Sequence, residues 1–73
     1  MSDKIKIPAS VFEGIEAVRR SGKTNMLDRP AAAAIALELG HVDAAIWLTD
    51  RDNFKTYAQG IFQGFIAEES RTP

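Results

Sequence analysis

Apolar residues recur at helical spacing in four stretches of the 73-residue chain. The first stretch repeats them between Val11 and Val18 and begins at Ser10, which with Glu13 has the Ser-x-x-Glu order of a helix N-terminus. Pro8 offers an alternative start two residues earlier. Gly22 is expected to end this helix, because glycine readily adopts the left-handed conformation found after helix C-termini.

The second stretch, Arg29–Leu39, is rich in alanine and apolar on nearly every side. Asp28 precedes it as a good N-cap. A helix without a clear polar face belongs at the centre of a small fold, so we expect this helix to be the most buried one. Gly40 ends it, and a third helix is predicted over residues 42–49.

The fourth stretch carries the clearest amphipathic pattern, with apolar residues at i, i+3, i+4, i+7 and i+8 over residues 54–66. Asp50 or Asp52 can cap this helix. Gly60 and Gly64 lie beside the apolar stripe and weaken the helix, so the close approach of a packed neighbour, expected to be another helix of this chain, explains them best.

These four stretches predict an all-α fold, a compact bundle of about four short helices. Residues 1–73 form one domain, with an ordered core at about residues 8–67 and frayed ends. A chain of this length buries only about 60% of the surface that its unfolded form exposes, so the core is thin. Cysteine is absent, which excludes disulfides, thiolate catalysis and Cys-based zinc sites.

The charge is nearly balanced along the chain. Residues 1–29 carry six Lys/Arg and four Asp/Glu, and residues 30–73 carry three and six, which gives +2 and −3. Nucleic acids and anionic membranes attract chains with a clear positive excess, so we expect neither as a partner. The apolar run Pro30–Leu39 is too short to cross a bilayer, and Met1–Ile7 lacks the apolar core of a secretory signal. We expect a cytoplasmic protein without a membrane association.

Three segments could be mistaken for catalytic or metal sites. Ser21–Thr24 resembles the end of a phosphate-binding loop, but its first glycine position is occupied by Ala17. Residues 50–53 begin like a calcium loop, yet Phe54 stands at the third ligand position. His41 is the single histidine and has no cysteine or second histidine as a companion ligand. We therefore predict no enzyme, no catalytic, cofactor-binding or metal site, and no cofactor.

Ala36, Gly40 and Ile46 have the spacing of the small, turn and apolar residues in helix-turn-helix units. A recognition helix presents Arg, Lys, Asn or Gln to bases and phosphates. The helix after this turn instead carries Asp43, and its nearest base, Arg51, lies beyond its end. A helix-turn-helix-like nucleic-acid-binding regulator is thus the alternative function and not the leading one.

The third and fourth stretches hold more large apolar side chains than one thin core easily hides. Tyrosine and tryptophan are frequent binding anchors, because they bury a large area and keep a polar tip. We expect Trp47, Tyr57, Phe62 and Phe65 to contact a protein partner, whose identity the sequence does not give. The same surface could pair two copies into a homodimer, because glycines at i and i+4 let helices approach closely.

Residues 23–28 show no periodic pattern and are predicted to form a loop. Asn25 and Asp28 have short polar side chains that can cap backbone amides, and Met26 is expected to reach the core. Thr24, Asn25, Met26 and Asp28 are therefore assigned to the loop and the helix cap.

The segment Ile15–Asp28, followed by Ile35-Ala36, Gly40 and Tyr57, resembles a family of small uncharacterised proteins from phages, prophages and bacteria. The pattern of that family is an I-R-x-S-G-x-T-N-M-[FL]-D core followed by an I-A-x-x-x-G helix and a Y-x-x-F-I helix. The resemblance covers most of Val11 to Ile66 and implies a phage-type accessory protein, without an activity or a ligand. The sequence thus predicts a small non-enzymatic protein-binding module, a phage-encoded modulator of a host protein.

Overall fold

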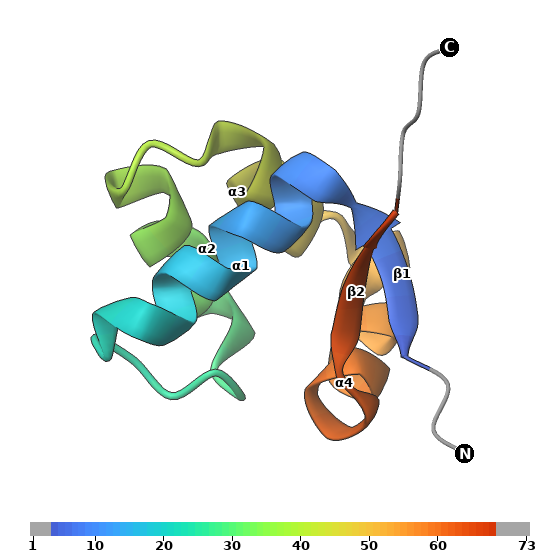
Figure 1. The fold of residues 1–73 in the computed structure, drawn as a ribbon. Coiled ribbons are helices and arrows are strands. Elements are labelled where there is room, and N and C mark those ends of the chain that lie inside the picture. The colour runs from blue at the N-terminus through green and yellow to red at the C-terminus, as the bar shows by residue number, and fades with distance from the viewer. Residues whose placement is uncertain (1–3, 69–73) are drawn as a thin grey trace, which may run out of the picture.

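The computed structural model describes residues 4–68 and contains four α-helices and two short strands (Figure 1). The elements in chain order are β1 (Ile5–Pro8), α1 (Ala9–Ser21), α2 (Arg29–Glu38), α3 (Val42–Thr49), the 3-10 helix η1 (Arg51–Asn53), α4 (Phe54–Gln63) and β2 (Phe65–Glu68). The prediction of an all-α fold is therefore corrected to a mainly α fold with a small sheet. The ends expected to fray are residues 1–7 and 68–73. Of these, Ile5–Ile7 lie in β1 and Glu68 ends β2, whereas residues 1–3 and 69–73 lie outside the described range.

The sheet consists of β1 and β2, which run parallel with Ile5 opposite Phe65. The Ile5 amide donates a hydrogen bond to the Gly64 carbonyl at 2.9 Å, which aligns the two strands. Ile7 and Phe65 are buried, whereas Lys6 and Ile66 lie opposite each other on the exposed face. The core therefore includes Ile7 of β1, although the sequence predicted an ordered core that begins at about residue 8.

The central helix of the fold is α1. It packs against α2, α3 and both strands, and it lies between the α2–α3 pair and the sheet (Figure 1). Its buried stripe contains Val11, Ile15 and Val18, as their spacing predicts. The expectation that the alanine-rich α2 is the central, most buried helix is wrong, because α2 buries small side chains on one side and exposes Leu37 on another.

The ends of α1 follow from backbone restrictions. The helix begins at Ala9 after Pro8, so the alternative start is the correct one, and no side chain at this end forms a cap hydrogen bond. Pro8 also ends β1, which places the helix start before Ser10 and leaves its capping box unformed. Gly22 ends the helix with a left-handed φ of 66°.

The helices α2 and α3 form a tight hairpin. Gly40 has a φ of 90° in the connection, and the His41 amide donates to the Ala36 carbonyl at 2.8 Å. The bounds of α3 are those predicted from the sequence. A Cβ atom at Gly14 of α1 would overlap the Cβ of Ala44, so α1 and α3 pack closely enough to require small residues.

The last part of the chain differs from the predicted long helix. α4 ends at Gln63, and Gly64 with a φ of 95° turns the chain into β2. The ring of Phe65 then folds back over Gly60, where an added Cβ atom would overlap it. The close neighbour expected at Gly60 therefore exists, but it is an aromatic ring on a strand and not a helix.

Candidate functional site

An apolar groove lies between α2 and α3 and has a volume of about 380 Å³. Its lining residues are Pro30, Ala33, Ala34 and Leu37 of α2 with Val42, Ala45, Ile46 and Thr49 of α3. The three largest of these side chains, Leu37, Val42 and Ile46, are 58%, 50% and 62% exposed. Large apolar side chains that gather in one hollow of a surface mark interaction sites more often than single exposed ones do.

The groove arises because both helices carry two apolar stripes. In α2 the buried stripe contains Ala32 and Ala36, whereas Leu37 follows on the other side. In α3 the lining positions 42, 45, 46 and 49 have the i, i+3, i+4, i+7 spacing of one helix face. Ala44 and Leu48 form the other stripe, which is buried in the core. The second stripe of each helix therefore faces the groove.

The chemistry of the groove is that of an apolar surface. None of its lining residues has a titratable side chain. The hydroxyl of Thr49, its one polar side-chain group, donates within α3 to the carbonyls of Ala45 at 3.1 Å and Ile46 at 3.0 Å. Small-molecule sites combine apolar walls with several convergent polar groups, which this groove lacks. Its lining thus suits apolar side chains of a macromolecule better than a polar substrate.

Within the segment that forms the groove the charged residues are acidic, and the exposed Arg51 follows this segment directly. Residues 30–50 contain three acidic residues, Glu38, Asp43 and Asp50, and no Lys or Arg. Asp43 and Asp50 line a second hollow that adjoins the groove at Ile46. Both carboxylates are therefore near the apolar lining, on the α3 side.

Arg29 lies at the start of α2 but is engaged in the fold. Its guanidinium donates to the Leu48 carbonyl at 2.6 Å and stacks 3.6 Å from the centroid of the Phe54 ring. A cation held over an aromatic ring and hydrogen-bonded to a carbonyl stabilises the joint between α2, α3 and α4. The Arg29 guanidinium is therefore not free to neutralise the acidic rim of the groove, which consists of Glu38, Asp43 and Asp50.

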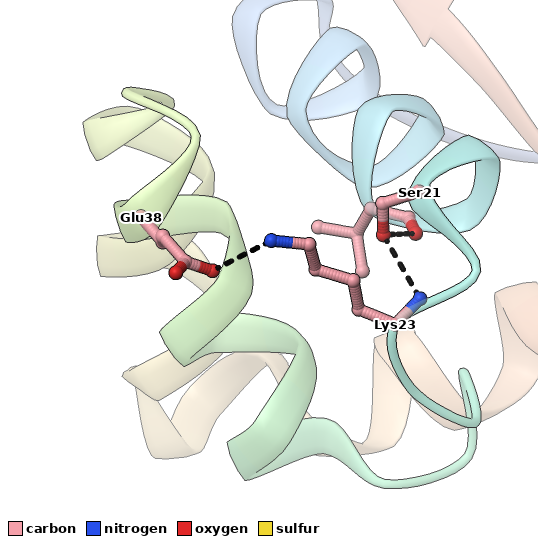
Figure 2. Close-up of polar contacts among 4 residues, drawn as sticks. Ser21, Lys23 and Glu38 are labelled. Carbon is pink, nitrogen blue, oxygen red and sulfur yellow. Dashed lines mark hydrogen bonds and ion pairs between the residues drawn. The ribbon is translucent and has the colours of Figure 1, made fainter.

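Figure 2 shows how the connection after α1 reaches α2. The Ser21 hydroxyl donates to the Val18 carbonyl at 2.6 Å and accepts from the Lys23 amide at 3.2 Å. The Lys23 ammonium lies 3.4 Å from the Glu38 carboxylate (Figure 2). Both side chains are more than half exposed, so this ion pair contributes about 0–1 kcal/mol. The lysine of the phosphate-loop-like sequence is thus paired with α2.

The residues assigned to the loop and cap have mainly backbone partners. The Asn25 side chain accepts from the Leu27 amide at 2.9 Å, and the Asp28 carboxylate accepts from the Ala31 amide at 3.2 Å. The Met26 carbonyl accepts a hydrogen bond from the Tyr57 hydroxyl. Thr24 contacts the Asn25 carbonyl at 3.5 Å, which is a weak interaction. These contacts order the connection between α1 and α2.

The four residues expected to contact a partner are not on one surface. Tyr57 and Phe65 are 3% and 7% exposed, and their rings stack with centroids 5.9 Å apart in the core. Trp47 is half-buried against the core. Phe62 is 84% exposed, but it is part of α4 and does not line the groove. A contact through Tyr57 or Phe65 would require the core to open, so we do not retain these two residues.

Sequence reasoning placed Val42 and Ile46 in the apolar pattern of the third helix, and Ile46 also in a helix-turn-helix pattern. It assigned neither of them, nor Leu37, to an exposed surface. The available signal was the apolar character of α2 on nearly every side. That pattern is typical of a buried helix, but it also occurs when a helix has one stripe in the core and another in a docking surface.

The described part of the chain shows neither a metal cluster nor a membrane-spanning helix. His41 is half-buried and packs against Gly14 of α1. Within residues 4–68, no three His, Asp or Glu side chains are grouped so that they could hold a metal ion. None of the helices in this range combines the length and the apolar character that a membrane span needs.

The fold and the groove define a small, mainly α domain with an exposed apolar surface between two helices. The chain belongs to a family described as a domain of unknown function (DUF5049), whose model matches residues 7–65. The match runs from β1 to the first residue of β2 and so covers nearly all of the fold. No curated protein and no solved structure matches the chain. These findings agree with the resemblance to an uncharacterised family.

Proposed function

We propose that this domain is a small, non-enzymatic protein-binding module whose α2–α3 groove receives apolar side chains of a partner protein. The observation that carries the proposal is the shared exposure of Leu37, Val42 and Ile46 in one groove. The sequence-based expectation placed the contact surface on the third and fourth helices. The exposed apolar residues favour α2 and α3 instead.

The exposed apolar side chains of the groove are large enough to contribute to the affinity for a partner. Full burial of a Val, Leu or Ile side chain is worth about 1.5–3 kcal/mol. Each of the three residues is already partly covered, so a partner would gain about 1 kcal/mol from each, or about 3 kcal/mol together. That gain corresponds to roughly a hundredfold in affinity. Rim charges contribute about 0.2–1 kcal/mol per exposed pair and are secondary.

We further propose that the protein is a phage-encoded modulator of a host protein. This part rests only on the resemblance of the Ile15–Asp28 motif to proteins of phages and prophages. It makes proteins of the host cell the first class of partner to test.

Nucleic-acid binding is the second candidate, because the α2–turn–α3 hairpin has the order of a helix-turn-helix unit. Its second helix would have to enter the major groove, where phosphates and base edges favour basic and amide side chains. α3 carries Asp43 and is followed by Asp50, with no Lys, Arg, Asn or Gln between Val42 and Thr49. These charges favour protein over DNA as the partner.

Affinity capture with matched variants tests the proposal. The wild-type protein, Ile46→Asp and Phe62→Asp are each used as bait in a host-cell lysate, and retained proteins are quantified by mass spectrometry. Both replaced residues are more than half exposed, so both variants should fold, which circular dichroism checks. We expect a partner that wild type and Phe62→Asp retain and that Ile46→Asp loses by about tenfold or more.

Two results would contradict the proposal. Loss of the partner only in Phe62→Asp would place the contact on α4. Binding of double-stranded DNA at about 150 mM salt, without a protein partner, would favour the helix-turn-helix function.

A further inference from the structure

We propose that the occupant of the α2–α3 groove is an amphipathic helix of another protein, with basic residues beside its apolar face. This inference rests on the proposed function and adds the shape and charge of the partner segment. It is drawn from the backbone, the lining and the rim of the groove.

The backbone of the groove favours a helix over an extended peptide. An extended segment needs free amides and carbonyls on its receptor, as at the open edge of a sheet. The walls here are two α-helices, whose amides and carbonyls bond within each helix, and the Thr49 hydroxyl is already engaged in α3. A strand laid in this groove would bury unpaired backbone groups, whereas a helix satisfies its own.

The dimensions agree with a short helical segment. α2 has 10 residues and α3 has 8, so the walls are about 12–15 Å long at 1.5 Å per residue. Two to three turns of a partner helix span this length. Its apolar side chains at i, i+3 or i+4, and i+7 can then insert beside Leu37, Val42 and Ile46.

The charged residues at the rim of the groove indicate which charge the partner segment should carry. Asp43 lies three residues before Ile46 in α3, Asp50 follows the end of α3 with an extended backbone, and both line the hollow that adjoins the groove at Ile46. Glu38 follows Leu37 on the α2 side, where Lys23 balances it. The acidic rim favours lysine or arginine next to the anchors of the partner.

A second copy of the chain fits this surface less well. Two-fold pairing through the groove would place residues 30–50 of both copies together, and each segment has a formal charge of −3 with His41 neutral. Like charges at a contact cost affinity. Pairing the groove of one copy with a different surface of the next would be a heterologous contact that need not close.

Two synthetic helical peptides of about 15 residues serve as probes. Both carry leucine at i, i+3, i+4 and i+7, and their flanking positions are lysine in one and glutamate in the other. Each is titrated into the isotope-labelled full-length protein and followed by NMR. We expect the lysine peptide to bind about tenfold more tightly and to shift the signals of Leu37, Val42 and Ile46. The difference should shrink at about 0.5 M salt.

Charge reversal provides the matched control. Asp43→Lys with Asp50→Lys should reverse the preference between the two peptides. Glu16→Lys with Glu68→Lys makes the same change in net charge on α1 and β2, where neither residue lines the groove or the hollow that adjoins it, and should leave the preference unchanged. Circular dichroism of both double variants verifies that they fold.

The outcomes separate this inference from the proposed function. Equal affinity for both peptides, or shifts centred on Phe62, would overturn the basic-helix occupant. If neither peptide shifts the groove while a captured partner still depends on Ile46, the occupant is wrong and the protein-binding function stands. Sedimentation that shows a dimer, which Ile46→Asp dissociates, would replace the partner helix with a second copy.

Discussion

Replacing Gly60 with alanine tests how α4 joins β2. The alanine Cβ would overlap the ring of Phe65, which lies over this position. Phe65 is 7% exposed and its ring stacks on that of Tyr57, so it cannot swing aside without losing burial. The substitution therefore sets a gain in helix propensity against a clash in the core.

The two effects can be compared in magnitude. Alanine in place of a helical glycine contributes about 1 kcal/mol. Overpacking a core costs typically about 1–3 kcal/mol, and the overlap here is with a large ring, so a cost near the upper end is expected. We predict that Gly60→Ala lowers the free energy of unfolding by about 1–2 kcal/mol. A domain of this length has roughly 4–11 kcal/mol of stability, so the variant should still fold.

Urea unfolding followed by circular dichroism measures the effect, and Phe65→Val is the control background. Valine removes the ring and keeps a residue that suits a strand. In this background Gly60→Ala should become stabilising by up to about 1 kcal/mol, because only the propensity gain remains. If Gly60→Ala stabilised the wild-type protein, the ring would not lie over Gly60. That result would instead fit the continuous helix over residues 54–66 that the sequence pattern suggests.

Substitutions at three further positions test local features. Burial raises the pKa of Tyr57, partly offset by the charges of Arg19 and Arg29. The folded state then holds this proton to higher pH than the unfolded state, so stability should fall as pH rises above about 10. Tyr57→Phe should reduce that slope in urea unfolding between about pH 7 and 11, and cost about 1 kcal/mol at pH 7 because the Met26 carbonyl loses its donor. Asp28→Ala should cost about 1 kcal/mol in thermal unfolding, and Asp28→Asn much less, because asparagine also caps helices. Gly22→Ala, at a φ of 66°, should cost about 1–2 kcal/mol in the same assay, and a smaller cost for Gly22→Asn would support the left-handed turn.

The helices could be predicted because their signals are local. Gly22 and Gly40 both adopt a positive φ where the helical spacing stops, and α3 has the predicted bounds. The sheet could not be predicted in this way, since β1 and β2 have four residues each and lie at opposite ends of the described chain. Phe65 and Ile66 continue the helical spacing of α4, so only Gly64 indicated the turn, and glycine there was interpreted as a packing residue.

The surface was less predictable than the fold, because a sequence shows which residues are apolar but not which ones are covered. Tyr57 and Phe65 are typical binding anchors by residue type, yet their rings fill the core next to Gly60. Leu37 has an ordinary core residue type, yet it is 58% exposed. Burial of Tyr57 and Phe65 depends on contacts between α4, β2 and the rest of the fold, and the helical spacing does not contain this information.

The distribution of side-chain size between α2 and α3 supports a role for the groove beyond stability. The buried positions of this hairpin include five alanines, Ala32, Ala33, Ala36, Ala44 and Ala45, whereas several larger aliphatic side chains occupy exposed positions. Small residues let neighbouring helices pack closely, as the approach of Ala44 of α3 to Gly14 of α1 shows. Leu37 and Ile46, in contrast, are more than half exposed and contribute little to the stability of the fold. Polar residues at these two positions should therefore lower the free energy of unfolding only slightly. We predict that Leu37→Gln with Ile46→Gln changes the free energy of unfolding by no more than about 1 kcal/mol, measured in urea, and abolishes capture of the partner. A large loss of stability would mean that these side chains serve the core, and the groove would then be a feature of packing.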